Sequence, residues 1–423
     1  DSIPLVVISG QVPLSLIGTD GFQEIDAVGI SRPCTKHNYL VGSLQELPRI
    51  LKEAFYIASS GRPGPVLVDI PKDITAEIGE FVYPKEVHIP TYRPSYKGND
   101  RQIKKAVEAI LDSKKPLLYL GGGVVLSNAS HLVRELAELT QIPAVETLMA
   151  RGVMGQDNPL LLGMLGMHGN YASNMAMSET DLVISLGARF DDRVTGKLSE
   201  FAKYADVIHV DIDPANIGKL VDVDYPIVGS ITDVLEKIIS LLKHSVKPDR
   251  YQAWREILAR YNELHPLKYD DSDDVLKPQW VIQRVGALLG KEAIITSDVG
   301  QHQMWAAQFY PFERPRQWIN SGGLGTMGFG FPAAIGAKIG VPEKIVVNFT
   351  GDGSILMNMQ ELVTAAEHKI PVINIILNNH FLGMVRQWQT FFYDKRYSET
   401  DLSFQPNFKA LAEACGGIGY DVT

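Results

Sequence analysis

The sequence predicts an α/β fold made of three doubly wound parallel-sheet domains, of which the first and the third are truncated. Two observations carry this prediction. Apolar runs of strand length alternate with segments of helical apolar spacing, in three blocks along the 423 residues. Polar stretches that contain proline separate the blocks. A chain of this length is also too long for one core.

The first predicted domain spans residues 1–80. Residues 3–10 and 64–71 read as buried strands, and residues 44–59 have the apolar spacing of a helix. A linker over 81–100, rich in proline and polar residues, follows. The short length of this block indicates that the domain is incomplete.

The second predicted domain spans residues 101–245. Its expected strands are 115–123, 142–149, 181–192 and 205–214. Its expected helices are 131–140 and 231–243. A second linker covers 246–277, with a short helix around Trp254 and an acidic run at 270–274. Such a block predicts a further parallel sheet covered by helices.

The third predicted domain spans residues 278–423. It begins with a helix at 278–290, a strand at 292–300 and a helix that starts near Gln301. A glycine-rich segment and a strand-helix-strand unit follow, and the chain then ends at GGIGYDVT, in mid-element. We therefore expect a longer polypeptide, trimmed at both ends.

The strand-helix-strand unit is the most informative part of the chain. Apolar runs at 345–353 and 372–379 flank a predicted crossover helix at 357–369. Asp352 and Asn379 lie 379 − 352 = 27 positions apart, each at the carboxyl end of a predicted strand. Parallel strands bring these ends together, and carboxylate and amide oxygens suit Mg²⁺ shared with phosphates.

Glycines on both sides of Asp352 support the same reading. Gly351 and Gly353 leave backbone room for a diphosphate, to which amides at a helix start could donate. The alternative is a tight strand-to-helix turn at Gly-Asp-Gly and a strand-end turn at Asn-Asn. The whole combination resembles the thiamine diphosphate signature, which favours the cofactor site.

Composition excludes several classes of function. A net charge of −9 argues against a nucleic-acid partner, and no apolar run is long enough to span a bilayer. The chain has 45% hydrophobic and 21% charged residues, as a globular protein does. Cys34 and Cys415 form neither a disulfide framework nor a metal spacing, which favours a reducing compartment.

Several segments resemble the catalytic subunit of the acetohydroxyacid synthase family, also called acetolactate synthase, over nearly the whole chain. They are SGQVP (9–13), IGTDGFQE (17–24), CTKHNYLV (34–41), SGRPGPVLVDIPKDI (60–74), LGMLGMHG (162–169), GARFDDRVTGKL (187–198), SDVGQHQMWAAQ (297–308), GGLGTMGFGFPAA (322–334) and NNHFLGMVRQWQ (378–389). RFDDRVTGK and GMVRQWQ discriminate best against other thiamine diphosphate enzymes.

The resemblance implies domains of the thiamine diphosphate enzyme type: the end of a pyrimidine-binding domain, a central FAD-binding domain and a diphosphate-binding domain. It implies that pyruvate is decarboxylated with thiamine diphosphate, and that its two-carbon unit is joined to pyruvate or 2-ketobutyrate. The products would be 2-acetolactate or 2-aceto-2-hydroxybutyrate, at the entry to valine, leucine and isoleucine biosynthesis. The flavin would be structural, because the reaction is redox-neutral.

The resemblance also assigns the thiamine diphosphate contacts. Three of them bind Mg²⁺, namely the side chains of Asp352 and Asn379 and the backbone carbonyl of Phe381. Met327 would be the apolar wedge behind the bent cofactor, where the alternative is a core methionine. The full set is Val299, Gly300, Gln301, His302, Gly325, Met327, Gly351, Asp352, Gly353, Ser354, Asn379, Phe381, Gly383 and Met384.

The flavin contacts follow from the resemblance, since a GGG turn alone is a weak nucleotide signal and strand-end aspartates are often solvated. They are Arg62, Gly121, Gly122, Gly123, Thr147, Leu148, Met149, Leu165, Gly166, Met167, His168, Gly187, Ala188, Arg189, Asp191, Arg193, Asp211, Ile212 and Asp213.

Catalytic roles are implied in the same way for Phe22, Gln23, Lys72, Met167, Arg193, His302 and Trp388. Arg193 would hold the carboxylate of the incoming keto acid, where the alternative is a surface ion pair with Asp191 or Asp192. Trp388 would wall the acceptor pocket and favour an ethyl over a methyl group, where the alternative is a core tryptophan. His302 would lie near the diphosphate, where the alternative is a structural histidine.

The family implies a homodimer or homotetramer, a regulatory small subunit and small 2-keto acid substrates, with no nucleic acid and no membrane. The location would be the cytoplasm for a bacterial or archaeal source, and a plastid or mitochondrion for a eukaryotic one. The family also needs a glutamate that hydrogen-bonds the aminopyrimidine ring, which we expect in residues preceding Asp1.

Two alternatives remain open at this point. Another flavin-containing carboligase, such as glyoxylate carboligase, has the same cofactors, although Arg193 and Trp388 argue against it. A non-catalytic cofactor-binding module would have lost the chemistry, and its only support is the absence of that glutamate from the 423 residues.

Overall fold

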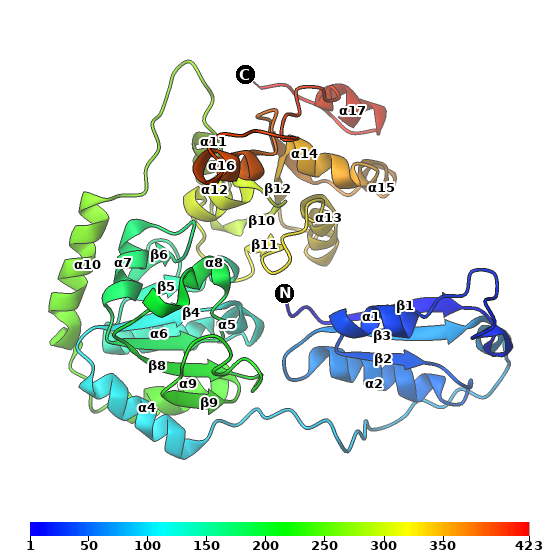
Figure 1. Ribbon diagram of the computed structural model, residues 1–423, viewed down its shortest axis with the longest axis horizontal. Helices are drawn as coiled ribbons and strands as arrows, with labels where there is room; N and C mark the ends of the chain where they lie inside the picture. Colours follow the sequence, from blue (N-terminus) through cyan, green and yellow to red (C-terminus); the bar gives the residue numbers. More distant parts are fainter. Residues whose placement is uncertain (423) are drawn as a thin grey trace. The chain divides into compact units, whose positions relative to one another are not determined.

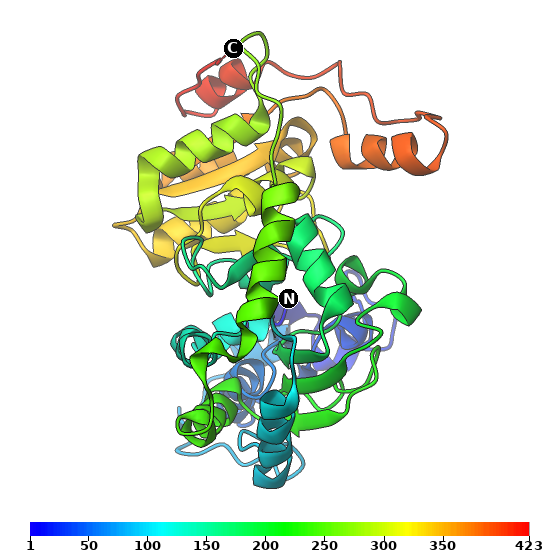
Figure 2. The ribbon, with the colours of Figure 1, turned by 90° about the vertical axis from the view of Figure 1, so that its left-hand side faces the viewer.

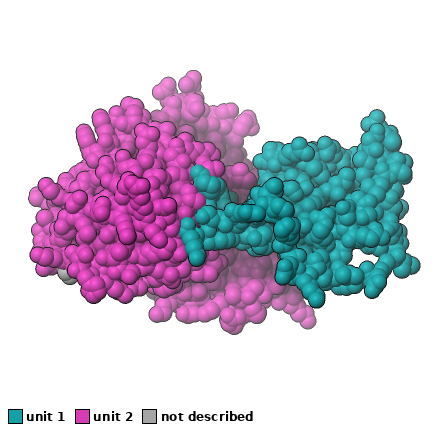
Figure 3. Space-filling model, turned by 90° about the horizontal axis from the view of Figure 1, so that it is seen from below, with its two compact units in different colours: residues 1–97, 212–214 teal, residues 98–211, 215–423 magenta. Residues whose placement is uncertain are grey.

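The computed structural model describes residues 1–422 and contains three parallel sheets (Figure 1), which confirms the predicted fold class. The chain divides into two compact units, coloured in Figure 3. The first holds residues 1–97 and 212–214, and the second holds 98–211 and 215–423. Within residues 1–422, no helix has the length and apolar character that a membrane crossing requires.

The first unit contains a three-stranded parallel sheet in the order β1-β3-β2. Its strands are β1 (Leu5–Gln11), β2 (His37–Leu40) and β3 (Pro65–Pro71), and its helices are α1 (Ala27–Ser31), α2 (Leu47–Ser59) and α3 (Lys72–Ala76). The amphipathic α2 packs Ile50, Ala54 and Ile57 against the buried Val66 and Val68 of β3.

The second unit begins with a six-stranded parallel sheet in the order β6-β5-β4-β7-β8-β9. Its strands are β4 (Pro116–Leu120), β5 (Ala144–Glu146), β6 (Leu161–Met164), β7 (Leu182–Leu186), β8 (Asp206–Asp211) and β9 (Tyr225–Val228). Numbered within the sheet, this order is 3-2-1-4-5-6, which is typical of dinucleotide-binding folds. The strand order reverses between β4 and β7, where such folds place their ligand.

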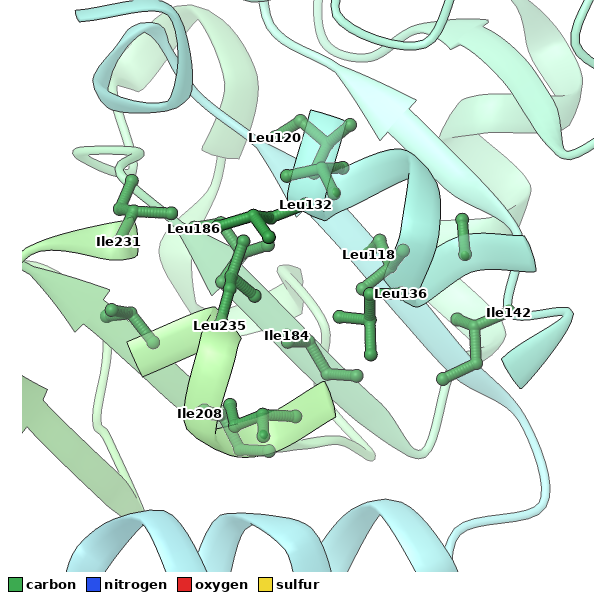
Figure 4. Close-up of a cluster of buried hydrophobic side chains, with 14 of the residues drawn as sticks. Leu118, Leu120, Leu132, Leu136, Ile142, Ile184, Leu186, Ile208, Ile231 and Leu235 are labelled. Atoms are coloured by element: carbon green, nitrogen blue, oxygen red, sulfur yellow. The ribbon is translucent and has the colours of Figure 1, made fainter. Parts of the chain in front are cut away.

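Helices cover both faces of this sheet, as its continuously apolar strands require. The helices are α4 (Asp100–Asp112), α5 (Gly122–Leu126), α6 (Ser130–Thr140), α7 (Tyr171–Glu179), α8 (Asp192–Thr195), α9 (Ile231–Leu242) and α10 (Gln252–Leu264). Figure 4 shows one of the two cores, in which Leu118 and Ile184 of the sheet meet Leu136 and Leu235 of α6 and α9. On the opposite face, α10 inserts Trp254, so the predicted linker 246–277 includes a 13-residue helix that belongs to this core.

The third sheet is parallel, in the order β11-β10-β12-β13. Its strands are β10 (Ile294–Ser297), β11 (Trp318–Asn320), β12 (Val346–Gly351) and β13 (Ile373–Leu377). Its helices are α11 (Pro278–Leu289), α12 (Gln301–Phe309), α13 (Gly330–Gly340), α14 (Asp352–Ile355), α15 (Glu361–Glu367), α16 (Gly383–Phe392) and α17 (Phe408–Ala414). Residues of α11 and α12 pack on one face, and residues of α13 and α15 pack on the other.

A row of polar side chains crosses this sheet. Thr296 Oγ1 donates to Asn348 Oδ1 at 3.1 Å, and Asn348 Nδ2 donates to Asn374 Oδ1 at 3.0 Å. The three residues are also register partners on β10, β12 and β13. Side-chain and backbone pairing therefore select the same alignment of the three strands.

The connection between β12 and β13 differs from the prediction of one helix at 357–369. The chain forms α14, a 3-10 turn at Leu356–Asn358 and then α15 (Glu361–Glu367). Beyond β13, α16 lies apart from the strands in Figure 2, between two extended segments. The predicted strands at the two ends of the unit are confirmed as β12 and β13.

Candidate active site

The carboxyl ends of β12 and β13 meet. Gly351, the last residue of β12, is the register partner of Leu377, the last residue of β13. Asp352 follows at once, is 2% exposed, and has the backbone N–H of His380 among the hydrogen-bond donors to its carboxylate. The two strand tips thus converge as the spacing predicts.

The Asp352 carboxylate is suited to a cation. Burial raises its pKa above the ordinary value, against hydrogen bonds from the backbone of Gly353 and His380. Its Oδ2 atom is buried and has no hydrogen-bond partner within residues 1–422. A buried carboxylate oxygen without a donor is costly, and a divalent cation would supply the missing partner.

Asn379, which precedes His380 in the chain, lies in a polar network of its own. Its Oδ1 accepts the backbone N–H of Phe381 at 3.1 Å, and its Nδ2 donates to Gln301 Oε1 at 3.4 Å. Gln301 Nε2 in turn donates to Gln387 Oε1 at 3.1 Å. A side chain at Gly383 would collide with Gln301 Oε1, so α12 and the start of α16 approach closely here.

The glycines around Asp352 line a cradle. A Cβ built on Gly351 would lie 2.9 Å from His302 Nδ1. A Cβ on Gly353 would lie 2.9 Å from Leu382 Cδ2 and 3.8 Å from Met327 Cε. Neither position has room for a side chain, which accounts for both glycines and brings the predicted wedge Met327 to the same place.

His302 is a neutral imidazole. The side chain is buried, and burial lowers its pKa from 6.5 to about 3. Its Nε2 is buried without a hydrogen-bond partner in the described part of the chain. The Nε2 atom can therefore form one hydrogen bond with a ligand.

The remaining predicted thiamine residues join the same cluster. Ser354 Oγ donates to the backbone oxygen of Val299 at 3.1 Å. A Cβ on Gly325 would lie 3.7 Å from Val299 Cγ1, and Gly300, with φ 155°, precedes α12. Met384, in the first turn of α16, is half-buried. Segments after β10, β12 and β13 and the glycine-rich segment are thus brought together.

The sequence reasoning missed Asp298, which organises this cluster. Its buried Oδ1 accepts the backbone N–H of Gly328 at 2.6 Å and that of Val299 at 3.2 Å. Its Oδ2 accepts Thr350 Oγ1 at 3.3 Å. Burial raises the pKa of Asp298. An aspartate directly after a buried strand was the available signal, the same one that singles out Asp352.

A second cluster lies where the strand order of the six-stranded sheet reverses. A Cβ on Gly121 would collide with the backbone oxygen of Gly187 and lie 2.5 Å from Ala188 Cα. A Cβ on Gly122 would lie 3.0 Å from Met149 Cβ. The predicted flavin residues 121–123, 149 and 187–188 are therefore neighbours, in loops that follow β4, β5 and β7.

The loop after β6 belongs to the same neighbourhood. The backbone N–H of Met167 donates to the oxygen of Arg193 at 2.8 Å. Burial, and then the charge of Arg193, lower the pKa of His168. Thr147 Oγ1 is buried and has no partner within residues 1–422. An unpaired buried hydroxyl here is a free position for a ligand.

Charged residues stand at the carboxyl ends of β7 and β8, next in the chain to this second cluster. Arg189 and Asp191 pair at 3.6 Å, and Asp211 at the end of β8 accepts Asn216 Nδ2 at 3.4 Å. In the first unit, Arg62 Nη1 lies 3.1 Å from Asp213 Oδ2. The other predicted flavin contacts, Leu148, Leu165, Gly166 and Ile212, lie in the loops after β5, β6 and β8.

The two residues predicted to select substrate lie together. The Cζ atom of Arg193 is 5.5 Å from the centroid of the Trp388 ring. Arg193 also pairs with Asp192 at 3.7 Å and is 59% exposed, which is the surface ion pair considered as its alternative. The guanidinium therefore has hydrogen-bond capacity that protein groups leave free for solvent or a ligand.

The remaining predicted catalytic residues lie in the first unit. Phe22 is 90% exposed, Gln23 has a φ of 66°, and Lys72 is the exposed first residue of α3. Within residues 1–422, no group of three or more His, Cys, Asp or Glu side chains could hold a metal ion. A metal at Asp352 would thus depend on amide and carbonyl oxygens as well.

Two family models match parts of this chain. Residues 298–423 match the family described as "Thiamine pyrophosphate enzyme, C-terminal TPP binding domain", and residues 103–238 match "Thiamine pyrophosphate enzyme, central domain".

Individual relatives are similar over almost the whole chain. An "Acetolactate synthase" of Mycobacterium leprae is 51% identical over 426 residues, covering 99% of this chain and 68% of the relative. The "Acetolactate synthase isozyme 3 large subunit" of Escherichia coli is 47% identical over 428 residues, covering 100% and 75%. An "Acetolactate synthase large subunit" of Haemophilus influenzae is 48% identical over 426 residues, covering 100% and 74%.

Proposed function

This chain belongs to the acetolactate synthase family, and from that premise we propose that the two clusters are its thiamine diphosphate and flavin sites. The function is the thiamine diphosphate-dependent synthesis of acetolactate. The observation that carries the site assignment is the buried, unpartnered Oδ2 of Asp352 at the point where β12 and β13 end. The acetolactate synthase relatives do not favour the glyoxylate carboligase alternative.

We propose that Asp352, Asn379 and the carbonyl of Phe381 hold Mg²⁺ against the diphosphate. Their oxygens are of the hard type that this ion takes, and the orphan oxygen of Asp352 fits it. Gly351 and Gly353 flank this carboxylate without side chains of their own, and Ser354 joins this turn to Val299. When bound, thiamine diphosphate supplies the electron sink for decarboxylation and carbon-carbon bond formation.

The protein groups around that site would bind and orient. Neutral His302 can form one hydrogen bond with a ligand at Nε2, on a ring whose Nδ1 lies beside Gly351. Met327 would exclude water beside Gly353 and support the bent cofactor. Gln301 is held by Gln387 and would place its amide toward the same space.

We propose that Arg193 and Trp388 receive the second keto acid. A guanidinium fork matches a carboxylate, and the indole ring would lie against its alkyl group. Phe22, Gln23 and Lys72 would contribute the wall of an active site in a second copy of the chain, as expected for a homodimer or homotetramer. The substrates would be pyruvate and 2-ketobutyrate.

We propose FAD at the second cluster, where the 3-2-1-4-5-6 strand order and the loops after β4 and β7 support a dinucleotide. The unpaired hydroxyl of Thr147 fits a polar group of such a ligand. The residues that would hold it include Gly121, Arg189 and Asp211. The flavin would be structural.

Two further expectations come from the relatives. Those of Escherichia coli and Haemophilus influenzae are named large subunits, so we propose that a regulatory small subunit binds this protein. They are bacterial, so we propose the cytoplasm as its location.

An assay of the full-length protein tests the proposal. We expect 2-acetolactate from pyruvate, with activity that requires added thiamine diphosphate and Mg²⁺ after both have been removed. Offering pyruvate and glyoxylate together distinguishes the carboligases, because a glyoxylate enzyme would consume glyoxylate first. A protein that binds both cofactors and forms neither product would support the non-catalytic module instead.

A further inference from the structure

We propose that the buried Glu146–Arg151 ion pair couples the loop at 147–149 to helix α12, so that flavin and thiamine diphosphate bind cooperatively. The inference rests on the proposed function, since it takes residues 147–149 as flavin contacts and the start of α12 as a thiamine diphosphate contact.

The ion pair closes the loop at its base. Arg151 Nη1 donates to Glu146 Oε2 at 2.8 Å, and the two side chains are 3% and 0% exposed. Glu146 also accepts the backbone N–H groups of Met154 at 2.9 Å and Gly152 at 3.4 Å. The loop 147–149 lies between the two partners, so its ends are held together.

Arg151 then reaches helix α12. Its Nε donates to the backbone oxygen of Ala307 at 3.0 Å, and its Nη2 donates to Gln156 Oε1 at 3.0 Å. Ala307 lies in the last turn of α12, where carbonyls lack an intrahelical partner and the helix dipole favours a cation. The same helix begins with Gln301 and His302, so one rigid element connects Arg151 to the proposed thiamine site.

Two other contacts link the same parts. Gln308 Nε2 on α12 donates to the backbone oxygen of His168 at 2.7 Å, in the other proposed flavin loop. Met149 packs so closely on Gly322 that a side chain there would collide with its sulfur. Gly322 begins the glycine-rich segment that carries Met327. Both flavin loops therefore contact elements of the thiamine site.

This arrangement has an energetic consequence. A ligand that orders 147–149 and a ligand that orders the start of α12 both stabilise the same position of Arg151. Each would then bind more tightly when the other is present, and linkage requires the two factors to be equal. Breaking one partner of a buried pair leaves a buried charge, whereas replacing both by apolar groups of similar volume is often tolerated.

The experiment measures cooperativity in the full-length enzyme. The dissociation constant of FAD is measured by flavin fluorescence, with and without thiamine diphosphate and Mg²⁺. For the natural protein we expect thiamine diphosphate to tighten FAD binding by about 5- to 150-fold, a usual range for coupled sites. In the double variant Glu146→Leu, Arg151→Met, we expect both cofactors to bind and the factor to fall severalfold, with the remainder carried by the contacts of Gln308 and Met149.

Arg134→Met is the matched control. Arg134 donates to the backbone oxygens of Gly152 and Val153, at 3.1 and 2.7 Å, and to that of Glu313. These hydrogen bonds reach neither Glu146 nor α12. This variant should keep the coupling factor of the natural protein, even where it lowers the melting temperature.

Gln308→Leu keeps the proposal testable if the double variant does not fold. It removes the link to His168 while leaving the buried pair intact, and it should lower the coupling factor severalfold. An unchanged coupling factor in the double variant would overturn the proposal. If only Gln308→Leu folds, an unchanged coupling factor in that variant would overturn it. A natural enzyme that binds no FAD would refute the flavin site itself, whereas independent binding of the two cofactors would refute the coupling alone.

Discussion

The guanidinium of Arg193 lies over the indole ring of Trp388, with its Cζ 5.5 Å from the ring centroid. The two residues lie on helices that follow strands of different sheets. Arg193 lies on α8, after β7, and Trp388 lies on α16, after β13. A cation over an aromatic face is attracted by about 0.5–2 kcal/mol, more when both are shielded from water. The pair can therefore hold α16, which otherwise lies apart from its strands, close to the central sheet.

Trp388→Leu should remove the preference for 2-ketobutyrate over pyruvate as the second substrate. The indole provides the apolar wall, and one methylene in such a pocket is worth about 1–3 kcal/mol, or about 10- to 200-fold. Product ratios from mixed substrates measure the change. Trp280→Leu is the control, because Trp280 is 42% exposed on α11, and its product ratio should match that of the natural protein. A natural ratio in Trp388→Leu would place the indole outside the acceptor pocket.

Asp352→Ala should abolish the Mg²⁺-dependent binding of thiamine diphosphate, by more than about 100-fold, because a proposed ligand is lost. FAD should still bind, with the affinity that the natural protein has for it in the absence of thiamine diphosphate, and flavin absorbance reports this in the same sample. Calorimetric titration of thiamine diphosphate at fixed Mg²⁺ measures the loss. Asp394→Asn, at a side chain that is 94% exposed, should bind as the natural protein does. Tight binding of thiamine diphosphate by Asp352→Ala would show that this residue is not a ligand of the metal.

Gly121→Ala should destabilise the protein and weaken FAD binding. The added methyl group would collide with the backbone oxygen of Gly187, and overpacking costs about 1–3 kcal/mol or more. Gly336→Ala is the control, for which we expect the opposite change in stability. A Cβ at Gly336 meets nothing within 4 Å, so alanine in α13 should stabilise the protein by about 0.5–1 kcal/mol. Urea denaturation measures both, and equal stabilities would contradict the predicted contact.

His209 should make the protein less stable in acid. Burial of this side chain, whose Nε2 donates to the Ala188 oxygen at 2.9 Å, lowers its pKa below the ordinary 6.5. As the pH falls below 6.5, this histidine binds a proton in the unfolded chain but not in the folded one, so the free energy of unfolding falls. Asp211 opposes the shift without reversing it.

The test compares free energies of unfolding from urea denaturation at about pH 7.5 and about pH 5.5, on both sides of the ordinary histidine pKa. His209→Gln should be less stable than the natural protein at the higher pH, and the gap should narrow at the lower one. His131→Gln, at an exposed position of α6, should follow the natural pH dependence. A gap that is constant with pH would show that His209 is not the titrating group.

The sequence was sufficient for strands that lie within continuous apolar runs, even for the short β5 and β10. Residues 345–353 and 372–379 contain β12 and β13 because buried parallel strands are apolar throughout. The short strands β2, β6, β9 and β11 went unrecognised, since so few residues show no period. The crossover was misjudged as one helix because its apolar spacing continues through the 3-10 turn at Leu356–Asn358.

The meeting of the strand ends at Asp352 and Asn379 could be predicted from spacing alone, because both strands belong to one local unit. The assignment of these residues to a metal site stays a prediction. The buried contact from Arg151 to Ala307 joins residues 156 positions apart, and only the packing of two sheets creates it. Asp298 could have been found, but its link to Gly328 depends on how the glycine-rich segment folds back.

The Thr296–Asn348–Asn374 row opposes any shift in the register of the strands of the third sheet. The apolar residues of β12 and β13 would tolerate a shift of two positions, since the same faces would remain inward. The amides would not, because the two asparagines would no longer be opposite each other and Asn348 would oppose Ile376 or Val372. A variant in which one strand is shortened, in order to change the distance between the two strand tips, would therefore need these asparagines at new positions as well.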